Sequence, residues 1–239
     1  MIYEVENKIF EIFPNFTRGV LIATDVNNHR LEPKLHCLLS CAAADANRSL
    51  SISEQGRLSV WDEVYRRFGS DADKFTPSIR FLYEQIRRGK ASTPISNIVD
   101  IFNIISLRWI VPCGGDDLGA LDGDDLRLGF AVGNETFAPL FKPSKIEHPT
   151  VGEVIYYSVP TKRIMCRRWT WRNADFSKIR PETDAVAINV DMMSPPFTQV
   201  DLHTALHDLA DLVLQFCGGN TSIHVLDQSN PKFSLPIIS

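Results

Sequence analysis

The residues best suited to ligand chemistry lie in a basic, tryptophan-bearing stretch at positions 162–180, KRIMCRRWTWRNADFSKIR. If its first half is extended, alternate side chains share a face. The two faces would be Arg167, Trp169 and Trp171 on one side and Cys166, Arg168 and Arg172 on the other. Flat aromatics beside a guanidinium suit stacking on a nucleobase or an aromatic side chain, and the opposite arginines suit phosphate. The competing interpretation is that the tryptophans fill the core and the arginines pair with an Asp-rich loop.

A second candidate is the pair Gly114-Gly115, which follows Pro112 and opens the acidic run GGDDLGALDGDDL. Adjacent glycines permit a tight turn or a close approach of the backbone to a ligand. Clustered carboxylates suit a hard cation, but the run lacks the D-x-[DN]-x-[DN]-G pattern of a calcium loop. We therefore expect turn structure here and no metal site.

Other chemistry-bearing residues are predicted to be structural. Cys113 and Cys166 have no histidine near them in sequence, which favours buried thiols over nucleophiles. His203 and His207 have a zinc-compatible spacing, but Thr204 stands where an HExxH motif has glutamate, so exposed histidines are expected. No P-loop, GxGxxG or GxSxG motif occurs, and no cofactor is expected.

A further possible metal cluster, His36 with Cys37 and Cys41, has no second ligand pair. Small thiols on an apolar helix are commonly core residues, and we expect them to be so here.

The composition fits an ordinary globular protein. The chain has 239 residues, 44% hydrophobic and 23% charged, with a net charge of −4. No global basic field is present to drive non-specific nucleic-acid binding, and DNA is not expected as a partner. An odd set of five cysteines without CxxC predicts reduced thiols in the cytoplasm. No apolar run approaches a membrane span, so we expect no membrane association.

The elements that must position the candidate residues can be placed by periodicity and punctuation. Ile98, Ile101, Phe102 and Ile105 make one face of a helix that leads to the Gly114 turn, with Asn97 and Asp100 near its start. Further helices are predicted at 30–45, from a Ser59 cap to Gly69, from Pro77 to Gly89, and at 198–216. Strands are predicted at 19–24, 126–130, 152–157, 164–168, 185–190 and 222–226.

Several landmarks, in their order, resemble the tRNA-binding and editing domain of the phenylalanyl-tRNA synthetase beta chain, and more closely its free-standing relatives. They are the stretch 97–103, the Pro112 turn, the GNETFAPL segment at 133–140, Gly152-Glu153-Val154, Trp169-Thr170-Trp171-Arg172 and Pro181-Glu182-Thr183. The similarity covers roughly residues 18–217, and we treat 1–239 as one domain. It implies an α/β (α+β) fold with a central mixed sheet and packed helices, and a pocket that in the synthetase hydrolyses tyrosine wrongly esterified to tRNA. Nothing resembles the ATP-binding core, so no ligase activity is expected.

Two synthetase features are replaced in this chain. Gly114 stands where the synthetase pocket has a histidine, and Trp171 to Asn173 replace its GGE segment. Specificity for tyrosine therefore does not carry over with the resemblance.

The resulting hypothesis is a trans-acting deacylase that binds the aminoacylated end of tRNA without metal or cofactor. Backbone N–H groups at Gly114 and Gly115 would stabilise the oxyanion, and Asp116 or Glu135 would orient water. The tRNA end would be bound by Arg167, Arg168, Trp169, Trp171, Arg172 and Asn173. The alternatives are a non-catalytic tRNA-binding module and a pocket protein for a free amino acid-like metabolite.

Overall fold

The computed structural model describes residues 1–90 and 94–235. Its strands are β1 (Ile2–Val5), β2 (Phe16–Thr24), β3 (Cys113–Asp117), β4 (Leu126–Phe130), β5 (Val154–Ser158), β6 (Ile164–Arg167), β7 (Arg172–Asn173), β8 (Val186–Met193), β9 (Asn220–Leu226) and β10 (Lys232–Ser234). Its α-helices are α1 (Asn7–Ile12), α2 (Pro33–Ala46), α3 (Ile52–Arg67), α4 (Ser78–Arg87), α5 (Asn97–Trp109) and α6 (Gln199–Phe216), with one short 3₁₀ turn, Gly119–Leu121.

The strands form two sheets. One has the order β10-β1-β4-β5-β6-β7 and is mixed, because β1 and β4 run parallel while its other neighbours are antiparallel. The other has the order β3-β8-β2-β9 and is wholly antiparallel. The expected α/β class with a mixed sheet is confirmed, and the strands are divided between two sheets instead of one central sheet.

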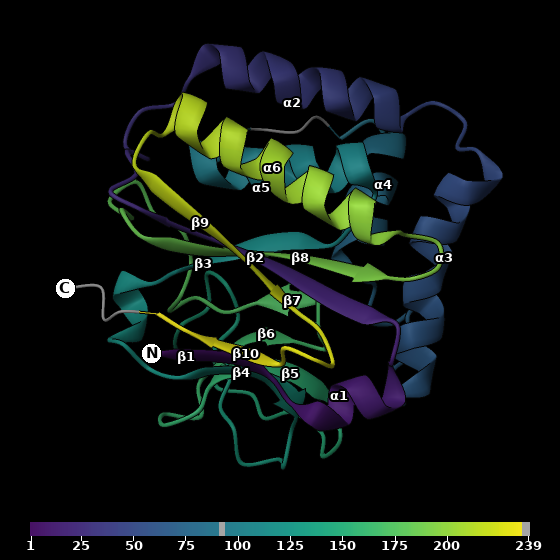
Figure 1. The fold of residues 1–239 in the computed structure, drawn as a ribbon, viewed down its shortest axis with the longest axis vertical. Helices are drawn as coiled ribbons and strands as arrows, with labels where there is room; N and C mark the ends of the chain where they lie inside the picture. The colour runs from purple at the N-terminus through teal and green to yellow at the C-terminus, as the bar shows by residue number, and fades with distance from the viewer. Residues whose placement is uncertain (91–93, 236–239) are drawn as a thin grey trace.

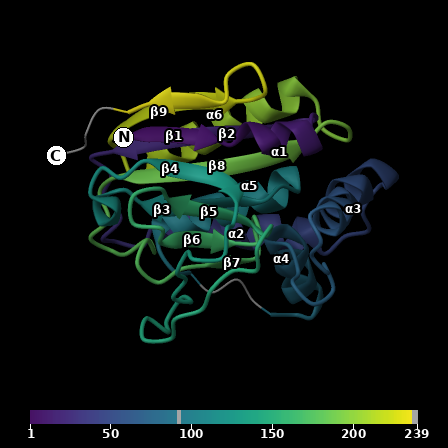
Figure 2. The same ribbon diagram turned by 90° about the horizontal axis from the view of Figure 1, so that it is seen from below.

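Three helices, α2, α5 and α6, lie on one side of the four-stranded sheet. Figure 1 shows α5 and α6 against that sheet, α2 beyond them, and the six-stranded sheet on the opposite side. In the view from below, α3 and α4 lie together at one end of the sheets (Figure 2). Side chains from both sheets, among them Val20, Ile188, Leu128 and Tyr156, belong to one buried hydrophobic cluster.

Side-chain caps mark the starts of α3, α5 and α6. At α6, the predicted Thr198 and Asp201 form a capping box, and His203 and His207 are exposed as expected. The start predicted for α3 is wrong: the helix begins after Ser51, whose side chain and that of Glu54 cap it. Ser59 lies inside the helix.

The start of α5 also differs in detail from the prediction. Ser96 is the N-cap and its hydroxyl accepts a hydrogen bond from the Val99 N–H at 3.4 Å. Asp100 accepts instead from the Ile95 N–H at 3.1 Å. Asn97 is buried and ties the preceding segment to the helix through the Arg30 carbonyl and the Glu32 N–H. Ser96 therefore satisfies backbone in the first turn of the helix, and Asn97 and Asp100 satisfy backbone of the segments next to it.

One local prediction around the candidate site is wrong, and one predicted strand ends before the two tryptophans. The expected turn at Gly114-Gly115 is strand β3, because these residues pair with β8. The strand predicted at 164–168 is confirmed as β6, but it does not extend to Trp171, because Arg168 and Trp169 adopt left-handed conformations with φ of 47° and 66°. This reversal separates the tryptophans, so they no longer share a strand face.

Cys37 and Cys41 are exposed on α2, not in the core as expected, and all five cysteines are free. Within residues 1–90 and 94–235, no helix is long and apolar enough to cross a membrane, and no cluster of His, Cys, Asp or Glu could hold a metal ion.

Candidate functional site: two adjoining cavities beside an edge strand

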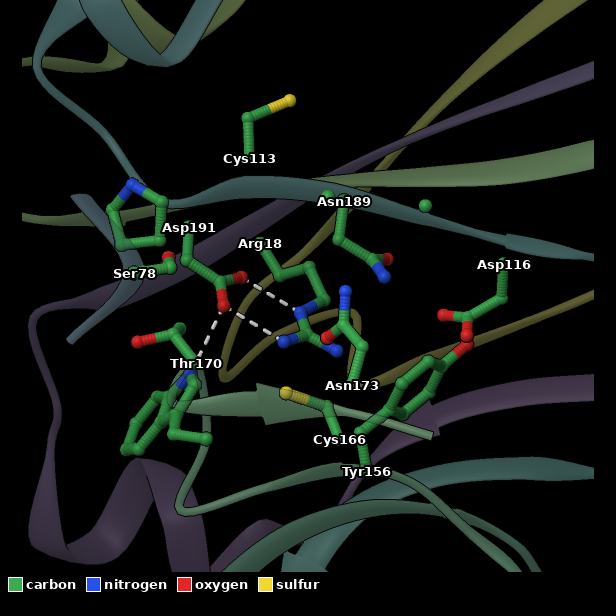
Figure 3. A pocket seen from close by; sticks show the side chains of 14 residues that line it. Arg18, Ser78, Cys113, Asp116, Tyr156, Cys166, Thr170, Asn173, Asn189 and Asp191 are labelled. Carbon is green, nitrogen blue, oxygen red and sulfur yellow. Dashed lines mark hydrogen bonds and ion pairs between the residues drawn. The ribbon is translucent and has the colours of Figure 1, made fainter. Parts of the chain in front are cut away.

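Two cavities adjoin at strand β3. The larger, which we call the outer cavity, has a volume of about 600 Å³. The smaller, the inner recess, has a volume of about 70 Å³ and lies between the two sheets, as the strands that carry its residues show (Figure 3). Residues that line both are Ser78, Cys113, Gly114, Gly115, Asp116 and Asn173. The edge strand thus forms a wall common to both spaces.

The outer cavity is largely apolar. It lies between α4, α5, β3 and the segments after β4 and β7. Its apolar lining includes Phe81, Leu82, Val99, Phe102, Phe141, Trp171 and Ile179. Lys178 and Arg180 supply cations. A space of this size and lining suits an apolar side chain joined to a polar or anionic group.

Strand β3 directs backbone donors toward this space. The Asp191 N–H donates to the Pro112 carbonyl at 3.1 Å, and the Asp117 N–H turns to Ser177 on the other side at 2.9 Å. Hydrogen-bonded pairs alternate along an antiparallel ladder, so Gly114 is engaged with β8 while the Gly115 N–H points away from it. Of the two glycines, Gly115 is the one whose N–H is placed to meet a ligand.

Gly114 contributes by lacking a side chain. A Cβ atom added to it would meet no heavy atom within 4 Å, whereas one added to Gly115 would lie 3.2 Å from the Ala187 carbonyl oxygen. Because Gly114 lines both cavities, the open space beside it belongs to the site.

Asp116 is the buried acid of the site. Its carboxylate accepts a hydrogen bond from the Ser177 hydroxyl at 2.6 Å. Burial raises the pKa of Asp116 to about 6, against the opposing effects of that hydrogen bond and of Arg18. A carboxylate with this pKa is deprotonated at neutral pH and is a stronger base than an ordinary aspartate.

The inner recess contains a buried ion pair that sequence reasoning did not single out. Arg18 donates to Asp191 from Nε and from Nη2, both at 2.7 Å, and Asp191 Oδ2 also accepts from the Trp169 indole N–H at 3.0 Å. Arg18 and Asp191 are each 2% exposed. Figure 3 shows this pair beside the amides of Asn173 and Asn189 and the ring of Tyr156. The recess therefore combines a buried ion pair with polar side chains in a small volume.

A signal for this pair was present in the sequence. Arg18 directly precedes the apolar run 19–24, and Asp191 directly follows the apolar run 185–190. The two residues face each other in the β2–β8 register. An arginine before one apolar run and an aspartate after the other therefore indicate a buried ion pair. This inference requires knowing that the two strands are antiparallel neighbours.

The basic stretch is largely engaged within the protein. Arg167 is buried and donates to both carboxylate oxygens of Glu153 at 2.8 Å, and Glu153 also lies 3.4 Å from Arg168. The arginines thus pair with Glu153 and Glu147, and not with the Asp-rich loop. Arg172 retains a one-third exposed side chain, 3.7 Å from Glu147.

The two tryptophans have different surroundings. Trp169 is 2% exposed and packs edge-on against Phe13, Phe16 and Trp61. Trp171 lines the outer cavity, as does Asn173. Of the residues expected at the site, the structure therefore brings Gly114, Gly115, Asp116, Trp171 and Asn173 to the same cavity.

Glu135 lies apart from these cavities. Its carboxylate accepts from the N–H groups of Val132 and Gly133 at 3.0 Å and 2.9 Å, and the residue is buried. It therefore stabilises the turn after β4 and does not line either cavity.

The cysteines of the site are poor nucleophile candidates, as the sequence indicated. Burial raises the pKa of the Cys166 thiol to about 12 and also raises that of Cys113. Both thiols are therefore protonated at neutral pH.

The fold and the site together define an α/β protein with a ligand-sized cavity at the edge strand of a small antiparallel sheet. Residues 60–218 match the family model of the B3/4 domain, and the chain belongs to this family. This agrees with the resemblance found in the sequence.

The chain is similar over most of its length to a solved structure. It is an N-terminal fragment of the phenylalanyl-tRNA synthetase beta-subunit from Pyrococcus horikoshii, matched with a TM-score of 0.44 and 12% sequence identity. The match covers 92% of this chain and 49% of that chain, so this chain spans about half the length of the fragment. No curated protein matches the sequence.

Proposed function

We propose that this protein is a trans-acting deacylase that hydrolyses aminoacyl esters at the end of tRNA. The observation that carries the proposal is the common wall of the two cavities, where a buried acid, Asp116, adjoins the outward-facing N–H of Gly115. Ester hydrolysis needs a base for water and a donor for the oxyanion, and these two groups supply both. Membership of the B3/4 family supports a module related to tRNA synthetases.

In the proposed reaction, the oxygen of a water molecule forms a bond to the ester carbonyl carbon, and Asp116 accepts a proton from that water molecule. The Gly115 N–H donates to the carbonyl oxygen as negative charge develops there. The carbon–oxygen bond to the terminal ribose then breaks, and the ribose oxygen receives the proton from Asp116. The amino acid leaves as the free acid.

Recognition of the substrate would be divided between the cavity and its rim. The amino acid side chain enters the outer cavity against Trp171 and Phe102. Arg172, Lys178 and Arg180 contact the phosphates of the tRNA end, since each retains solvent exposure. The rim is held in place by residues with buried contacts, namely Arg167 and Arg168, which pair with Glu153, and Trp169 in the core.

Hydrolysis of a panel of correctly and wrongly charged tRNAs by the purified protein tests the proposal. We expect selective release of an amino acid, and a loss of at least 100-fold in rate in Asp116→Asn, in line with removal of a general base. Asp117→Asn is the matched control, because Asp117 lines neither cavity. Its two carboxylate oxygens accept from the Thr183 hydroxyl and the Gly119 N–H, and the amide oxygen of asparagine can retain one of these contacts. Absence of release across the panel would reject the deacylase.

A second candidate, a pocket protein for a free amino acid-like metabolite, is favoured by the internal pairing of Arg167 and Arg168 with Glu153. That pairing reduces the positive charge available to RNA. For such a protein, thermal stability would rise with the metabolite and not with tRNA. A non-catalytic tRNA-binding module would show the opposite ligand response and no release.

A further inference from the structure

The inner recess contains a guanidinium nitrogen that has no acceptor. Arg18 Nε and Nη2 bind Asp191, whereas Nη1 is buried and has no hydrogen-bond partner in the part of the chain that the structure describes. In Figure 3 this nitrogen points away from Asp191, to the side of the recess where Asn173 and Tyr156 lie. The buried Tyr156 hydroxyl also lacks a partner there.

Such an arrangement is costly unless an acceptor is supplied. A buried donor without a partner destabilises a fold by about 1–3 kcal/mol, and buried polar groups are nearly always paired. Arg18 cannot turn to find another acceptor, because two hydrogen bonds to Asp191 fix the guanidinium plane and Trp169 fixes Asp191. The donor is therefore pre-oriented toward the recess.

The charges around the recess limit what the acceptor can be. Asp191 already neutralises Arg18, and Asp116 lines the same recess. A ligand carboxylate would place a further negative charge beside these two acids, which is unfavourable at low dielectric. A neutral oxygen, from a hydroxyl or an amide, accepts from Nη1 without this repulsion.

The size of the recess limits how much of a ligand can enter. Its volume of about 70 Å³ holds a terminal group only, while the adjoining outer cavity of about 600 Å³ holds the remainder. Ser78 and Asn173 line both spaces, so one ligand can extend from one to the other.

We propose that the inner recess is a specificity subsite, in which Arg18 Nη1 donates a hydrogen bond to a neutral oxygen at the end of the substrate's side chain. Asp191 is the positioning residue that holds Arg18. The inference rests on the proposed function for the aminoacyl nature of the substrate, and it restricts that substrate to amino acids whose side chains end in a hydroxyl or an amide.

Binding of non-hydrolysable analogues tests the subsite separately from catalysis. The probes are 3′-aminoacylamido-3′-deoxyadenosines that carry the members of near-isosteric pairs: valine and threonine, leucine and asparagine, methionine and glutamine, phenylalanine and tyrosine. We expect wild-type protein to bind the oxygen-bearing member of at least one pair about 10- to 100-fold more tightly, as for a hydrogen bond to a charged group. The pair that shows this preference gives the side-chain length that reaches the recess.

Arg18→Lys is the decisive variant. An ammonium group can retain the contact with Asp191 but lacks the second, forked nitrogen, so the preference should disappear. Arg57→Lys is the matched control, because Arg57 pairs with Asp201 and lines neither cavity. Should Arg18→Lys not fold, the double variant Arg18→Met, Asp191→Asn removes both charges together and should likewise lose the preference.

The outcomes separate the two proposals. Equal affinity within every pair, or a preference that survives in the Arg18 variants, would overturn the subsite even if tRNA esters are hydrolysed. A preference lost in the Arg18 variants, without hydrolysis of any ester by wild-type protein, would support the subsite and reject the deacylase.

Discussion

Arg18 and Asp191 face each other across β2 and β8, joined by two hydrogen bonds of 2.7 Å and almost fully buried. The pair lies at the floor of the inner recess, and its remaining guanidinium nitrogen faces the recess. Removing one partner leaves an uncompensated buried charge, which costs more than the pair itself contributes.

Asp191→Ala is therefore expected to destabilise the protein by about 3–5 kcal/mol. Asp191→Asn should cost less, because the amide oxygen can still accept from the Trp169 indole. Urea unfolding of both variants and of the wild type measures the difference. A loss below 1 kcal/mol in the alanine variant would mean that the pair is solvated in the folded protein.

The raised pKa of Asp116 predicts two pH effects of known sign. Its ordinary value is 3.8 and its folded value is about 6, so the folded state retains the proton over an interval in which the unfolded state has lost it. Stability should consequently fall as pH rises from about 4 to about 6, by up to about 3 kcal/mol at 1.36 kcal/mol per pKa unit. Asp116→Asn should remove this dependence and unfold at higher temperature than the wild type at pH 7.

Hydrolysis should depend on pH in the opposite sense. The base is the deprotonated form of Asp116, so the rate should rise through an apparent pKa near 6 and then level off. Rates at saturating substrate between pH 4.5 and 8 measure this. A profile that is flat across this interval would remove Asp116 from the role of base.

Trp169 and Trp171 are separated by only one residue and should respond oppositely to truncation. Trp169→Ala removes a side chain surrounded by Phe13, Phe16 and Trp61, with an expected loss of about 3–5 kcal/mol. Trp171→Ala should cost less stability but weaken binding, because Trp171 lines the outer cavity. Denaturant unfolding and analogue binding are measured for both variants. The assignment would be contradicted if Trp171→Ala lost the stability and Trp169→Ala lost only the binding.

Sequence patterns predicted some elements around the site and missed others. Some helices follow local rules: α4 was found from Pro77 at its start and Gly89 after its end, and α6 from its capping box and glycine stop. Whether Gly114-Gly115 forms a turn or a strand depends on pairing with β8, a contact distant in sequence. Left-handed backbone at Arg168 and Trp169, residues that rarely adopt it, has no local signal either. Tertiary contacts therefore decide the part of the site that sequence patterns missed.

Substitution of the two glycines of β3 should affect ligand binding and protein stability differently. Gly114→Val places a side chain into open space within the cavities, so binding should weaken at least 10-fold with little change in stability. Gly115→Val is expected to destabilise the fold, since its Cβ would be 3.2 Å from both the Ala187 carbonyl oxygen and Ile188. Analogue titration and thermal melts on both variants check this, and unchanged binding in Gly114→Val would place the ligand elsewhere.

The exposed part of Arg172 should contribute to tRNA affinity through phosphate. Arg172→Ala is expected to weaken tRNA binding at low salt and to reduce the slope of log affinity against log salt by about 1. Arg163→Ala, another exposed arginine, which lies over Phe176 and lines neither cavity, serves for comparison. An unchanged slope in Arg172→Ala would remove it from the tRNA contact surface.

The inner recess is bounded by both sheets, with Arg18 and Asn189 from one and Tyr156 and Cys166 from the other. A ligand seated there would form contacts to β2 and β5 at once, and neither sheet could separate from the other without first releasing it. The rate of amide hydrogen exchange should then fall in β2 and β5 together, although these strands are not hydrogen-bonded to each other. At excess ligand the expected factor is the ligand concentration divided by the dissociation constant. Ligand binding in the recess would therefore stabilise the packing of the two sheets against each other.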